Sequence, residues 1–327
     1  ADDGIRDSST SRGLGDVYKR QLYMICCAGS GHIGSSFSSI DLMNWIIGEL
    51  DKKYENLYFF SSKGHDAPAL YNSLIAHGKL DFSYLNRLRK IDGLPGHPDI
   101  NTPNIFANTG SLGMGISKSK GIIKANKLKG MDSKVIVLTG DGGLQEGQIW
   151  ESLNRVPQEN LKELMIIVDN NKFQSDRSVK FTSNLGNIEK KFKSFGIETI
   201  SCDGNNVGEF SKAFESLELS KKPSALIANT IKGHGVSFMH GDSLIEGEFY
   251  QYHSGAINQK DFDSSILELS NNINKIEVYD NSHYAGKEAV GSYIVADKNG
   301  FLKKEYRKFN IKEAATNDDY GMMKEVL

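Results

Sequence analysis

From Val135 to Gly147 the sequence reads Val-Ile-Val-Leu-Thr-Gly-Asp-Gly-Gly-Leu-Gln-Glu-Gly. Its first part, Lys134 to Thr139, is apolar on both faces and β-branched, which is typical of a strand buried in a parallel sheet. Asp141 follows that strand, at the carboxyl edge where open α/β sheets bind ligands. Gly142 and Gly143 let the backbone approach a bulky anion, and the helix expected next directs its first N–H groups toward it. We therefore predict an anion-binding turn, suited to a diphosphate, at the end of a parallel strand.

A carboxylate beside a diphosphate would repel it unless a hard cation lay between them, and magnesium is the natural choice. A second metal ligand should come from the end of the next strand. Leu164 to Asp169 is another buried run, and Asn171 follows it thirty residues after Asp141. A strand, a crossover helix and a strand take about 30 residues, so the two strand ends should be neighbours. The Asn171 amide oxygen and the Phe173 main-chain carbonyl could then join Asp141 around the metal.

The region from Leu22 to Asn229 alternates amphipathic and buried apolar stretches. Ser39 to Leu50 has apolar residues at helical spacing, with Ser39 or Asp41 as its expected N-cap. Further elements are expected as helices at Gly147–Arg155 and Val207–Leu219 and as strands at Gly196–Cys202 and Ser224–Asn229. Repeated β-α-β units predict an α/β fold with a mostly parallel sheet covered by helices on both faces, a three-layer α/β/α arrangement.

The composition is that of a globular protein, with 39% hydrophobic and 24% charged residues among 327. Lys plus Arg is 39 and Asp plus Glu is 41, so no basic excess favours a nucleic-acid partner. Three cysteines provide neither a disulfide framework nor a zinc motif. No apolar run approaches the roughly 18 residues that a membrane helix needs. We expect a cytoplasmic protein that uses neither nucleic acid nor a membrane.

The two ends of the chain differ from the middle. Residues 1–21 are polar and lack a hydrophobic period, so we expect a disordered or non-native leader, which resembles translated adapter sequence. The alternative is a signal peptide, but Leu22–Ala28 is about the shortest apolar region that one can have. Removing residues 1–21 should then leave stability unchanged. The domain itself is expected over 22–258, and the Asn/Asp-rich residues that follow, 259–310, are expected to form a linker.

Other phosphate motifs fit poorly, because Gly142–Gln148 lacks the Lys-Ser/Thr of a P-loop and Gly113–Lys118 lacks the last glycine of a dinucleotide fingerprint. Gly-Asp-Gly followed about 30 residues later by Asn-Lys resembles the thiamine diphosphate motif, and GDGGLQEGQIWES resembles transketolase-type enzymes in particular. The resemblance runs from about Leu22 to Ala256 and is nearest to the N-terminal subunits of split bacterial transketolases. Four other segments agree in order: Ser30–Ser36, Ser62–Leu70, Gly93–Asp99 and Thr109–Gly115.

The resemblance implies a thiamine diphosphate-binding fold that uses thiamine diphosphate and Mg²⁺ to transfer a two-carbon ketol unit from a ketose to an aldose, with sugar phosphates as substrates. One departure leaves an alternative open. Ile33 stands where the family usually has proline, and with Gly34-Ser35-Ser36 it also resembles deoxyxylulose-phosphate synthases, which use pyruvate. A second alternative is a non-catalytic cofactor-binding subunit that needs a partner chain.

Three histidines lie within the shared motifs. The resemblance implies that His65 contacts the cofactor diphosphate, while His32 and His97 reach the hydroxyls of the donor sugar. Neutral imidazole suits this work, because it can donate and accept hydrogen bonds and can move a proton near neutral pH. Most histidines are ordinary surface or core residues, and that is the interpretation kept for the others outside the shared motifs. These are His77, His234, His240 and His283.

A late catalytic histidine is also implied, and His253 in Tyr-His-Ser-Gly is the choice, with His240 in Met-His-Gly as the runner-up. The resemblance further implies that the main chain of Gly110 and Leu112 holds the aminopyrimidine ring. Glu146 matches a carboxylate that links the two cofactor sites across a dimer. Its alternative role is a charge in the first turn of a helix.

The glutamate that activates the cofactor in this family lies on a separate pyrimidine-binding domain, and nothing from Leu22 to Ala256 supplies it. Asn317–Met323 resembles the opening helix of that domain, so residues 311–327 are expected to be its truncated start. The implied partner is a pyrimidine-binding domain or a C-terminal transketolase subunit, in a homodimer or a heterotetramer. The chain alone should therefore be an incomplete enzyme.

Overall fold

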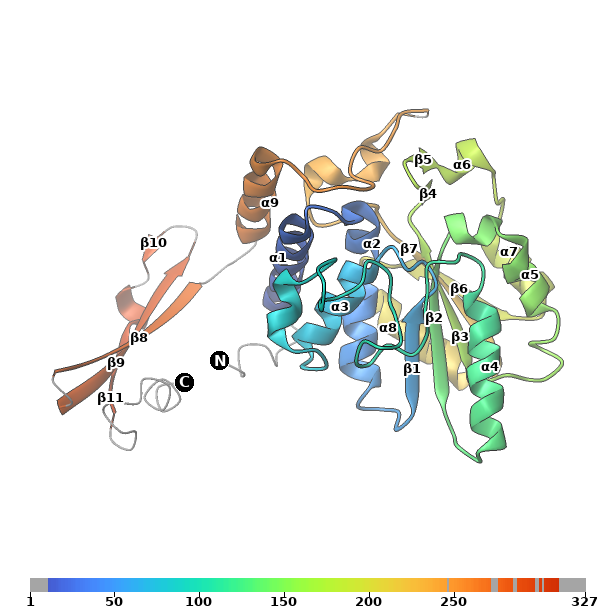
Figure 1. The fold of residues 1–327 in the computed structure, drawn as a ribbon, viewed down its shortest axis with the longest axis horizontal. Helices are drawn as coiled ribbons and strands as arrows, with labels where there is room; N and C mark the ends of the chain where they lie inside the picture. Colours follow the sequence, from blue (N-terminus) through green and yellow to red (C-terminus); the bar gives the residue numbers. More distant parts are fainter. Residues whose placement is uncertain are drawn as a thin grey trace. The chain divides into compact units, whose positions relative to one another are not determined.

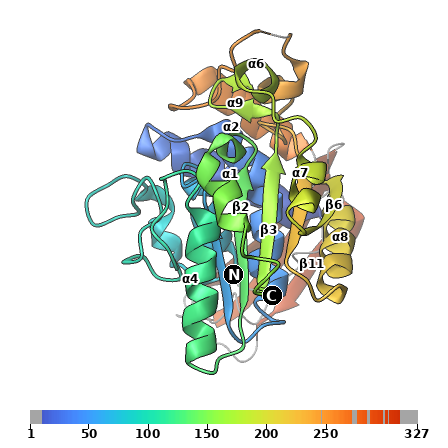
Figure 2. The same cartoon turned by 90° about the vertical axis from the view of Figure 1, so that its right-hand side faces the viewer.

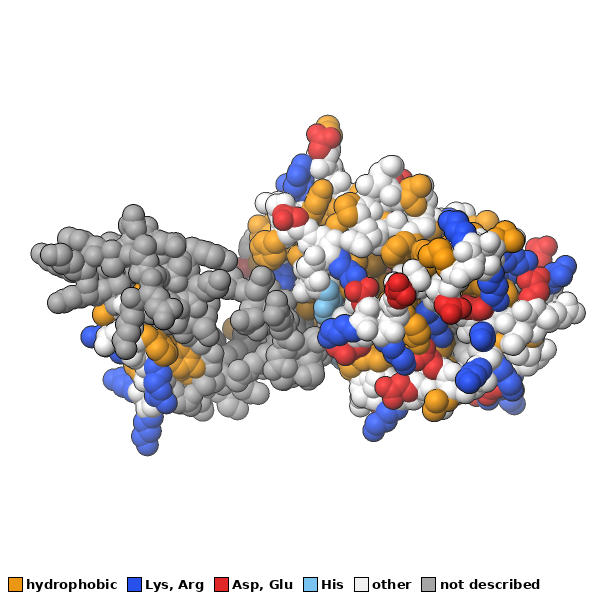
Figure 3. All heavy atoms as spheres, turned by 90° about the horizontal axis from the view of Figure 1, so that it is seen from below, with side chains coloured by type: hydrophobic (Ala, Val, Ile, Leu, Met, Phe, Trp, Pro, Cys, Tyr) orange, Lys and Arg blue, Asp and Glu red, His pale blue; other side chains and the backbone are white. Residues whose placement is uncertain are grey.

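The computed structural model describes residues 11–271 except 246, and residues 276–284, 287–297, 300–301 and 303–311. The chain forms two compact units, one of residues 16–263 and one of residues 1–15 and 264–327. None of the helices in these described parts is both long and apolar enough to cross a membrane. On the face drawn in Figure 3, acidic, basic and apolar side chains of residues 16–263 are interspersed.

A five-stranded parallel sheet forms the centre of the larger unit. Its order is β1 (Leu57–Ser61), β2 (Lys134–Gly140), β3 (Leu164–Asn170), β7 (Ser224–Asn229) and β6 (Glu198–Asp203). Gly140 of β2 pairs with Asp169 of β3, so both strands end at the same level. Asp141 and Asn171 consequently follow adjacent strand ends, as the sequence predicts. The strands predicted from the sequence lie within two residues of these bounds.

Helices cover both faces of the sheet, which confirms the predicted α/β fold (Figures 1 and 2). One face is covered by α4 (Gly115–Leu128), α5 (Gly147–Leu153) and α7 (Ile188–Ser194). The other is covered by α2 (Ile33–Trp45), α3 (Ala67–Ala76) and α8 (Val207–Leu219). Alternate strand residues turn to each face, and those of the first face are fully buried against helix residues. This core includes Val135, Val137, Ile166 and Val168 of the strands with Ile116, Ile149 and Phe192 of the helices.

The turns and the hairpin that follow the strand ends contribute residues to a cavity. A two-stranded hairpin follows β3, with α6 (Val179–Thr182) directly after it. The remaining elements of the larger unit are a π-helical turn (Ile46–Leu50), 3₁₀ turns (Phe82–Asn86, Gly142–Gln145, Ser237–Met239, Gly241–Ser243) and the hairpin strands β4 (Phe173–Gln174) and β5 (Arg177–Ser178). The Asp141 turn is continued by a 3₁₀ turn, and α5 begins at Gly147, where the sequence predicts a helix.

Helix α2 begins six residues before the predicted start at Ser39. The predicted caps Ser39 and Asp41 lie inside the helix and are buried, so that expectation is wrong. Serine usually favours helix ends because its hydroxyl competes for backbone groups. Here the hydroxyl of Ser39 donates to the Ser35 carbonyl at 2.9 Å, within the helix itself. A serine-rich stretch can therefore continue a buried helix.

The predicted disordered leader is wrong for residues 11–21. Helix α1 runs from Ser11 to Ala28, and Val17, Tyr18 and Gln21 are buried. The Tyr18 ring packs edge-on against Phe37 with centroids 5.1 Å apart, and its hydroxyl donates to Asp41 at 2.9 Å. The sequence lacks a long apolar period here, but these residues dock the first part of the helix, which continues into the buried Leu22, Met24 and Ile25. Residues 1–10 lie outside the described residues.

Replacing Tyr18 by alanine is therefore expected to lower the free energy of unfolding by about 3–5 kcal/mol, the usual cost of removing a buried aromatic side chain. The loss of its hydroxyl also leaves the buried Asp41 carboxyl without this donor. Tyr23→Ala on the same helix is the matched control, because Tyr23 is 43% exposed and should cost less than about 1 kcal/mol. Urea unfolding would measure the loss of unfolding free energy in both variants. Equal losses would indicate that Tyr18 is not docked on the domain, as expected for a disordered leader.

The predicted linker 259–310 is also wrong. It contains α9 (Gln259–Asn271) and an antiparallel sheet in which β9 (Lys287–Asp297) pairs with three other strands. These are β8 (Ile276–Tyr284), β10 (Gly300–Phe301) and β11 (Arg307–Asn310), with a 3₁₀ turn at Lys303–Glu305. An antiparallel sheet can keep one polar face, so Asn and Asp residues within strands misled the prediction. The helix that the resemblance implies at Asn317–Met323 lies outside the described residues.

Candidate active site

A cavity of about 280 Å³ lies at the carboxyl ends of β1, β2 and β3. Most of the predicted site residues meet there, although they come from segments more than two hundred residues apart. The lining residues are His32, Ser35, Lys63, His65, His97, Leu112, Gly140–Gly143, Asn171, Phe173, Gln174, Ser175, Lys232 and His253. Of the predicted set, Gly110 and Glu146 are not among them.

Three of the histidines form a cluster. The ring centroid of His32 lies 5.2 Å from that of His65 and 5.1 Å from that of His253, and His65 and His253 are 6.2 Å apart. His32 precedes α2, His65 follows β1 and His253 follows β7, so the parallel sheet brings them together. The runner-up His240 instead stacks on His234 with centroids 5.9 Å apart, outside this cavity.

The imidazoles in the cluster are held neutral. Burial, followed by the charge of His253, lowers the pKa of His32 to about 4. Burial and then Lys232 lower the pKa of His253 to about 4, and burial places the pKa of His65 well below its ordinary value. At neutral pH each ring therefore has one donor and one acceptor nitrogen. Nδ1 of His32 is buried without a partner, so it is free for a bound hydroxyl.

These pKa values predict a pH dependence of stability. Because the native pKa of His32 and His253 is about 4 and the unfolded value is about 6.5, the unfolded chain binds more protons between these pH values. Their contribution to stability is therefore present above pH 6.5 and is lost as the pH falls toward 4. The double variant His32→Asn/His253→Asn should lose less melting temperature between pH 7 and 4.5 than the parent chain. Parallel melting curves across that range would contradict the assigned burial.

Two glycines beside the cavity histidines have conformations and close contacts that a side chain would not allow. Gly64 precedes His65 with φ +72°, and a Cβ there would come within 2.5 Å of the Gly110 backbone nitrogen. Gly110 has φ +116°, and a Cβ on it would meet the His97 ring at 3.0 Å. A residue with a side chain would be strained at both positions. Gly110 therefore supports His97 at the cavity wall, while Leu112, 36% exposed, lines it.

Asp141 is the carboxylate of the cavity. It is 1% exposed, and its oxygens accept the backbone N–H of Gly142 at 2.8 Å and of Lys172 at 2.5 Å. Burial, and then the negative charge of Asp169, raise the pKa of Asp141 to about 7. A cation bound at the free lone pairs of this buried carboxyl would favour its ionised form and lower its pKa. Gly142 itself is tightly placed, since a Cβ on it would lie 3.2 Å from Gln174.

Asn171 and Phe173 complete a set of hard oxygen ligands. The Asn171 amide oxygen accepts the backbone N–H of Phe173 at 3.0 Å, and both residues line the cavity with Asp141. A carboxylate, an amide oxygen and a main-chain carbonyl suit Mg²⁺, which usually takes one or two carboxylates together with substrate phosphates. No group of three or more His, Cys, Asp or Glu able to hold a metal occurs among the described residues. The oxygen set therefore fits magnesium held jointly with an anion, and not a protein-only metal cage.

Lys232 is a site residue that the sequence reasoning missed. It is 1% exposed, its ammonium donates to the Ser175 carbonyl at 2.5 Å, and it lies 3.4 Å from Nδ1 of His253. Burial lowers its pKa to about 7, although Asp141 acts in the opposite direction. A buried ammonium in a cavity is well placed to bind an anion. The signal available was its position three residues after β7, whose neighbour β3 is followed by Asn171.

Glu146 lies outside the cavity and is exposed. Its Cβ would lie 2.9 Å from a Cβ on Gly113, so it stands beside the loop that begins α4. Glu146 is also the residue before α5, but its side chain makes no capping hydrogen bond there. A carboxylate at this position can still interact favourably with the dipole of α5, so the alternative role stays open.

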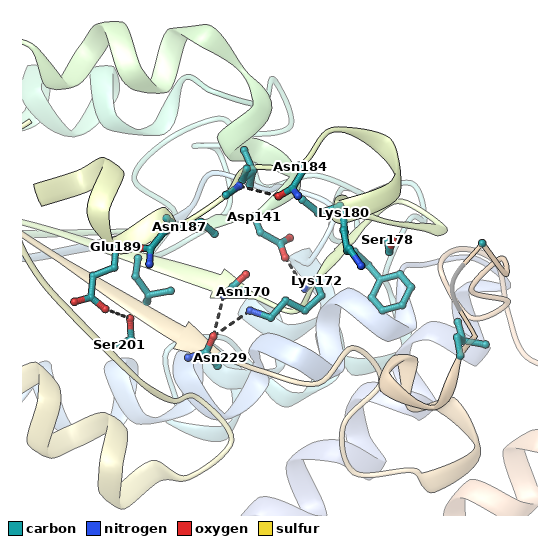
Figure 4. Close-up of a pocket in the computed structure, with 18 of the residues that line it drawn as sticks. Asp141, Asn170, Lys172, Ser178, Lys180, Asn184, Asn187, Glu189, Ser201 and Asn229 are labelled. Carbon is teal, nitrogen blue, oxygen red and sulfur yellow. Dashed lines mark hydrogen bonds between the residues drawn. The ribbon is translucent and has the colours of Figure 1, made fainter. Parts of the chain in front are cut away.

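A larger cavity, about 580 Å³, adjoins the first and shares Asp141 and Phe173 with it. Several of its polar side chains pair with one another (Figure 4). Asn229 accepts from Asn170 at 2.8 Å and from Lys172 at 3.1 Å, and Ser201 donates to Glu189 at 2.5 Å. The smaller cavity holds the histidine cluster and the unpartnered Nδ1 of His32, so it is the candidate active site.

Residues 20–256 match the family model described as the transketolase thiamine diphosphate binding domain. A subunit of apulose-4-phosphate transketolase from Phocaeicola vulgatus is 31% identical over 272 residues, covering 80% of this chain and 94% of that protein. The protein of the same name in Actinobacillus succinogenes is 36% identical over 220 residues, covering 64% and 80%. Human transketolase is 33% identical over 219 residues, which is 35% of its length.

The solved structures agree on the fold. Transketolase from Campylobacter jejuni superposes with a TM-score of 0.67 at 23% identity, covering 81% of this chain and 42% of that one. Transketolase from Pichia stipitis in complex with sedoheptulose-7-phosphate gives 0.70 at 21% identity, covering 81% and 41%. The chain thus spans about two fifths of these solved transketolase chains, whereas it spans most of the two relatives that are named as subunits.

Residues 264–327 match a different family model, the UvrC RNAse H endonuclease domain. The start of a pyrimidine-binding domain, predicted for residues 311–327, therefore finds no support, and the match covers the predicted linker as well. The larger unit, residues 16–263, and the transketolase match, residues 20–256, coincide closely.

Proposed function

The chain belongs to the transketolase family, and we propose that its residues 16–263 are the diphosphate-binding half of a magnesium-dependent ketol transferase. The observation that carries the proposal is a single cavity that joins the buried Asp141, the Asn171 amide and Lys232 to three neutral histidines. An anion and a cation can be held on one side of it and polar hydroxyls on the other. Residues 264–327 match an endonuclease domain and are not part of this proposal. The expectation that the protein binds no nucleic acid is therefore kept only for residues 16–263.

The cavity residues fit thiamine diphosphate and Mg²⁺. Asp141, Asn171 and the Phe173 carbonyl would hold the metal, and Lys232 with His65 would hold the diphosphate. The main chain of Gly110 and Leu112 would hold the aminopyrimidine. When bound, thiamine diphosphate supplies the carbanion chemistry by which the C–C bond beside a ketose carbonyl is broken and remade.

The histidines would act on the sugar. His32, His97 and His253 can each hydrogen-bond a hydroxyl of the ketose and move a proton between the hydroxyl and the ring. Burial favours the neutral ring of His32 and His253, so these two can accept a proton without first losing one. The rings of His32 and His253 pack edge to face beside His65, which suits a sugar lying over the bound cofactor.

A partner chain would complete the site. Several relatives are named as subunits of a transketolase, which supports a C-terminal transketolase subunit in the role of partner, in a dimer or a heterotetramer. Exposed Glu146 would reach across that interface to the second cofactor site. The same relatives are named for apulose-4-phosphate and 6-deoxy-6-sulfo-D-fructose, so we propose a ketose with an anionic group as the donor class.

Product analysis tests the proposed reaction. In the presence of a C-terminal transketolase subunit, the chain should convert a ketose phosphate and an aldose phosphate into ketol-transfer products and should not consume pyruvate. Asp203→Ala, which removes an exposed carboxylate at the end of β6, is the control for effects of a substitution outside the cavity. Consumption of pyruvate with release of CO₂ would instead assign the deoxyxylulose-phosphate synthase alternative.

A further inference from the structure

Asp169 is a buried carboxylate beneath the cavity that none of the assignments above uses. It is 0% exposed and is the penultimate residue of β3. Its Oδ2 accepts from Lys63 Nζ at 2.5 Å and from Ser38 Oγ at 2.7 Å, and its Oδ1 accepts from Thr230 Oγ1. One carboxylate thereby ties together α2, the end of β1 and the end of β7.

Oδ2 of Asp169 also accepts a hydrogen bond from the Asn171 side-chain amide. Asn171 Nδ2 lies 3.2 Å from Asp169 Oδ2 and 3.1 Å from Ser38 Oγ. An amide has a donor end and an acceptor end, and an ionised carboxylate has only acceptors. Only the NH₂ end of Asn171 can therefore face Asp169. The oxygen end is turned the other way, where it accepts the Phe173 N–H at 3.0 Å.

We propose that Asp169 is a positioning residue that fixes which end of the Asn171 amide is offered to the metal. The inference rests on the proposed function, because it concerns the ligand oxygen of the proposed magnesium site. Outer-shell partners that orient a ligand typically change metal affinity by about 10–100-fold when they are removed. Without Asp169 the amide could rotate by half a turn and present its NH₂ group, which no cation accepts.

The ion pair with Lys63 can be separated from this role. Lys63 Nζ also lies 3.2 Å from Asp66, which is 0% exposed, so the lysine keeps one buried counter-charge when Asp169 is removed. Asp169→Leu keeps the approximate volume and removes all acceptors. Thr230→Val is the matched control, because it removes a donor from the other oxygen of the same carboxylate without touching Asn171.

The test is the affinity of the full chain for Mn²⁺ in the presence of saturating thiamine diphosphate, measured by electron paramagnetic resonance. Asp169→Leu should weaken Mn²⁺ binding by about tenfold or more, and Thr230→Val should change it by less than about threefold. Asn171→Asp in the parent chain should also weaken binding, since a second carboxylate would then face Asp169 in place of the amide donor.

The decisive variant is Asp169→Leu/Asn171→Asp. An aspartate has oxygens at both ends and needs no orientation, so the double variant should bind Mn²⁺ at least about tenfold more tightly than Asp169→Leu. A purely structural role for Asp169 would give no such rescue. Wild-type affinity in Asp169→Leu, or a double variant no tighter than Asp169→Leu, would overturn the inference.

Two other results, an Asp169→Leu variant that does not fold and a parent chain that does not bind Mn²⁺, lead to different conclusions. If Asp169→Leu does not fold, the exchange Asp169→Asn/Asn171→Asp restores a donor facing an acceptor and should bind Mn²⁺ more tightly than Asn171→Asp alone. An exchange variant no tighter than Asn171→Asp would overturn the inference. If the parent chain shows no Mn²⁺ binding that depends on thiamine diphosphate, the proposed function fails, and the positioning role fails with it.

Discussion

Replacing Asp141 by alanine is expected to abolish magnesium-dependent binding of thiamine diphosphate while the fold is retained. Asp141 is the only carboxylate among the described residues that line the cavity, so its loss leaves the metal without an anionic ligand. Removal of an outer-shell partner costs about 10–100-fold in metal affinity, and a direct anionic ligand should cost more. The fold should persist, because a buried carboxyl whose pKa is raised to about 7 is not a source of stability at neutral pH.

Calorimetric titration of thiamine diphosphate in excess Mg²⁺ would measure this effect. Asp203→Ala is the matched control, since it removes an exposed carboxylate from the end of β6, outside the cavity. Asn171→Ala should weaken binding less than Asp141→Ala does, because a neutral amide contributes less to a divalent cation. Normal affinity in Asp141→Ala would exclude the cofactor assignment, whatever the outcome for the other two variants.

The second large effect concerns catalysis by the chain alone. It should exchange the C2 proton of thiamine diphosphate slowly, and a C-terminal transketolase subunit supplied in trans should accelerate the exchange by about 10²–10⁴-fold, the usual contribution of a positioned acid or base. The structure gives the reason. Asp141 is the proposed metal ligand, Glu146 is exposed outside the cavity, and Asp169 and Asp66 are paired with Lys63. No other described carboxylate lines the cavity, so we propose that the activating glutamate comes from the partner subunit.

Proton NMR of the cofactor in deuterated solvent follows that exchange directly. A C-terminal subunit whose activating glutamate is replaced by glutamine is the control, because it preserves association and removes the acid. Rapid exchange on the isolated chain would show that an activating group is already present. Equal slow exchange with the intact and the altered subunit would show that the partner does not complete this site.

The central fold was predictable because its signals are local and strong. The runs at Leu164–Asn170 and Ser224–Asn229 are buried on both faces, which few structures other than parallel strands allow. The thirty-residue spacing of Asp141 and Asn171 was enough to place them on adjacent strands, because β2 and β3 are consecutive in the chain and paired in the sheet. Motif and topology agree here.

The remaining features depend on tertiary context. Lys232 reaches the site because β7 is inserted beside β3, ahead of β6, an order that no local pattern encodes. Tyr18 docks the first part of helix α1 together with Val17 and Gln21, and these few residues among polar neighbours give no hydrophobic period. The strands after Ile276 carry polar residues that an antiparallel sheet tolerates, so composition alone suggested a linker. Asp169 was visible only as the end of an apolar run, and its proposed role rests on three elements that converge on it.

The central claim is that this chain holds the diphosphate of thiamine diphosphate through a metal at Asp141, and one calorimetric comparison tests it most directly. Thiamine diphosphate and thiamine, which lacks the diphosphate, are titrated into the full chain in Mg²⁺ and again in EDTA. The account predicts binding of thiamine diphosphate in Mg²⁺, at least about tenfold weaker binding in EDTA, and no detectable binding of thiamine in either. Equal affinity for thiamine and thiamine diphosphate, or an affinity that does not change when the metal is removed, would contradict it.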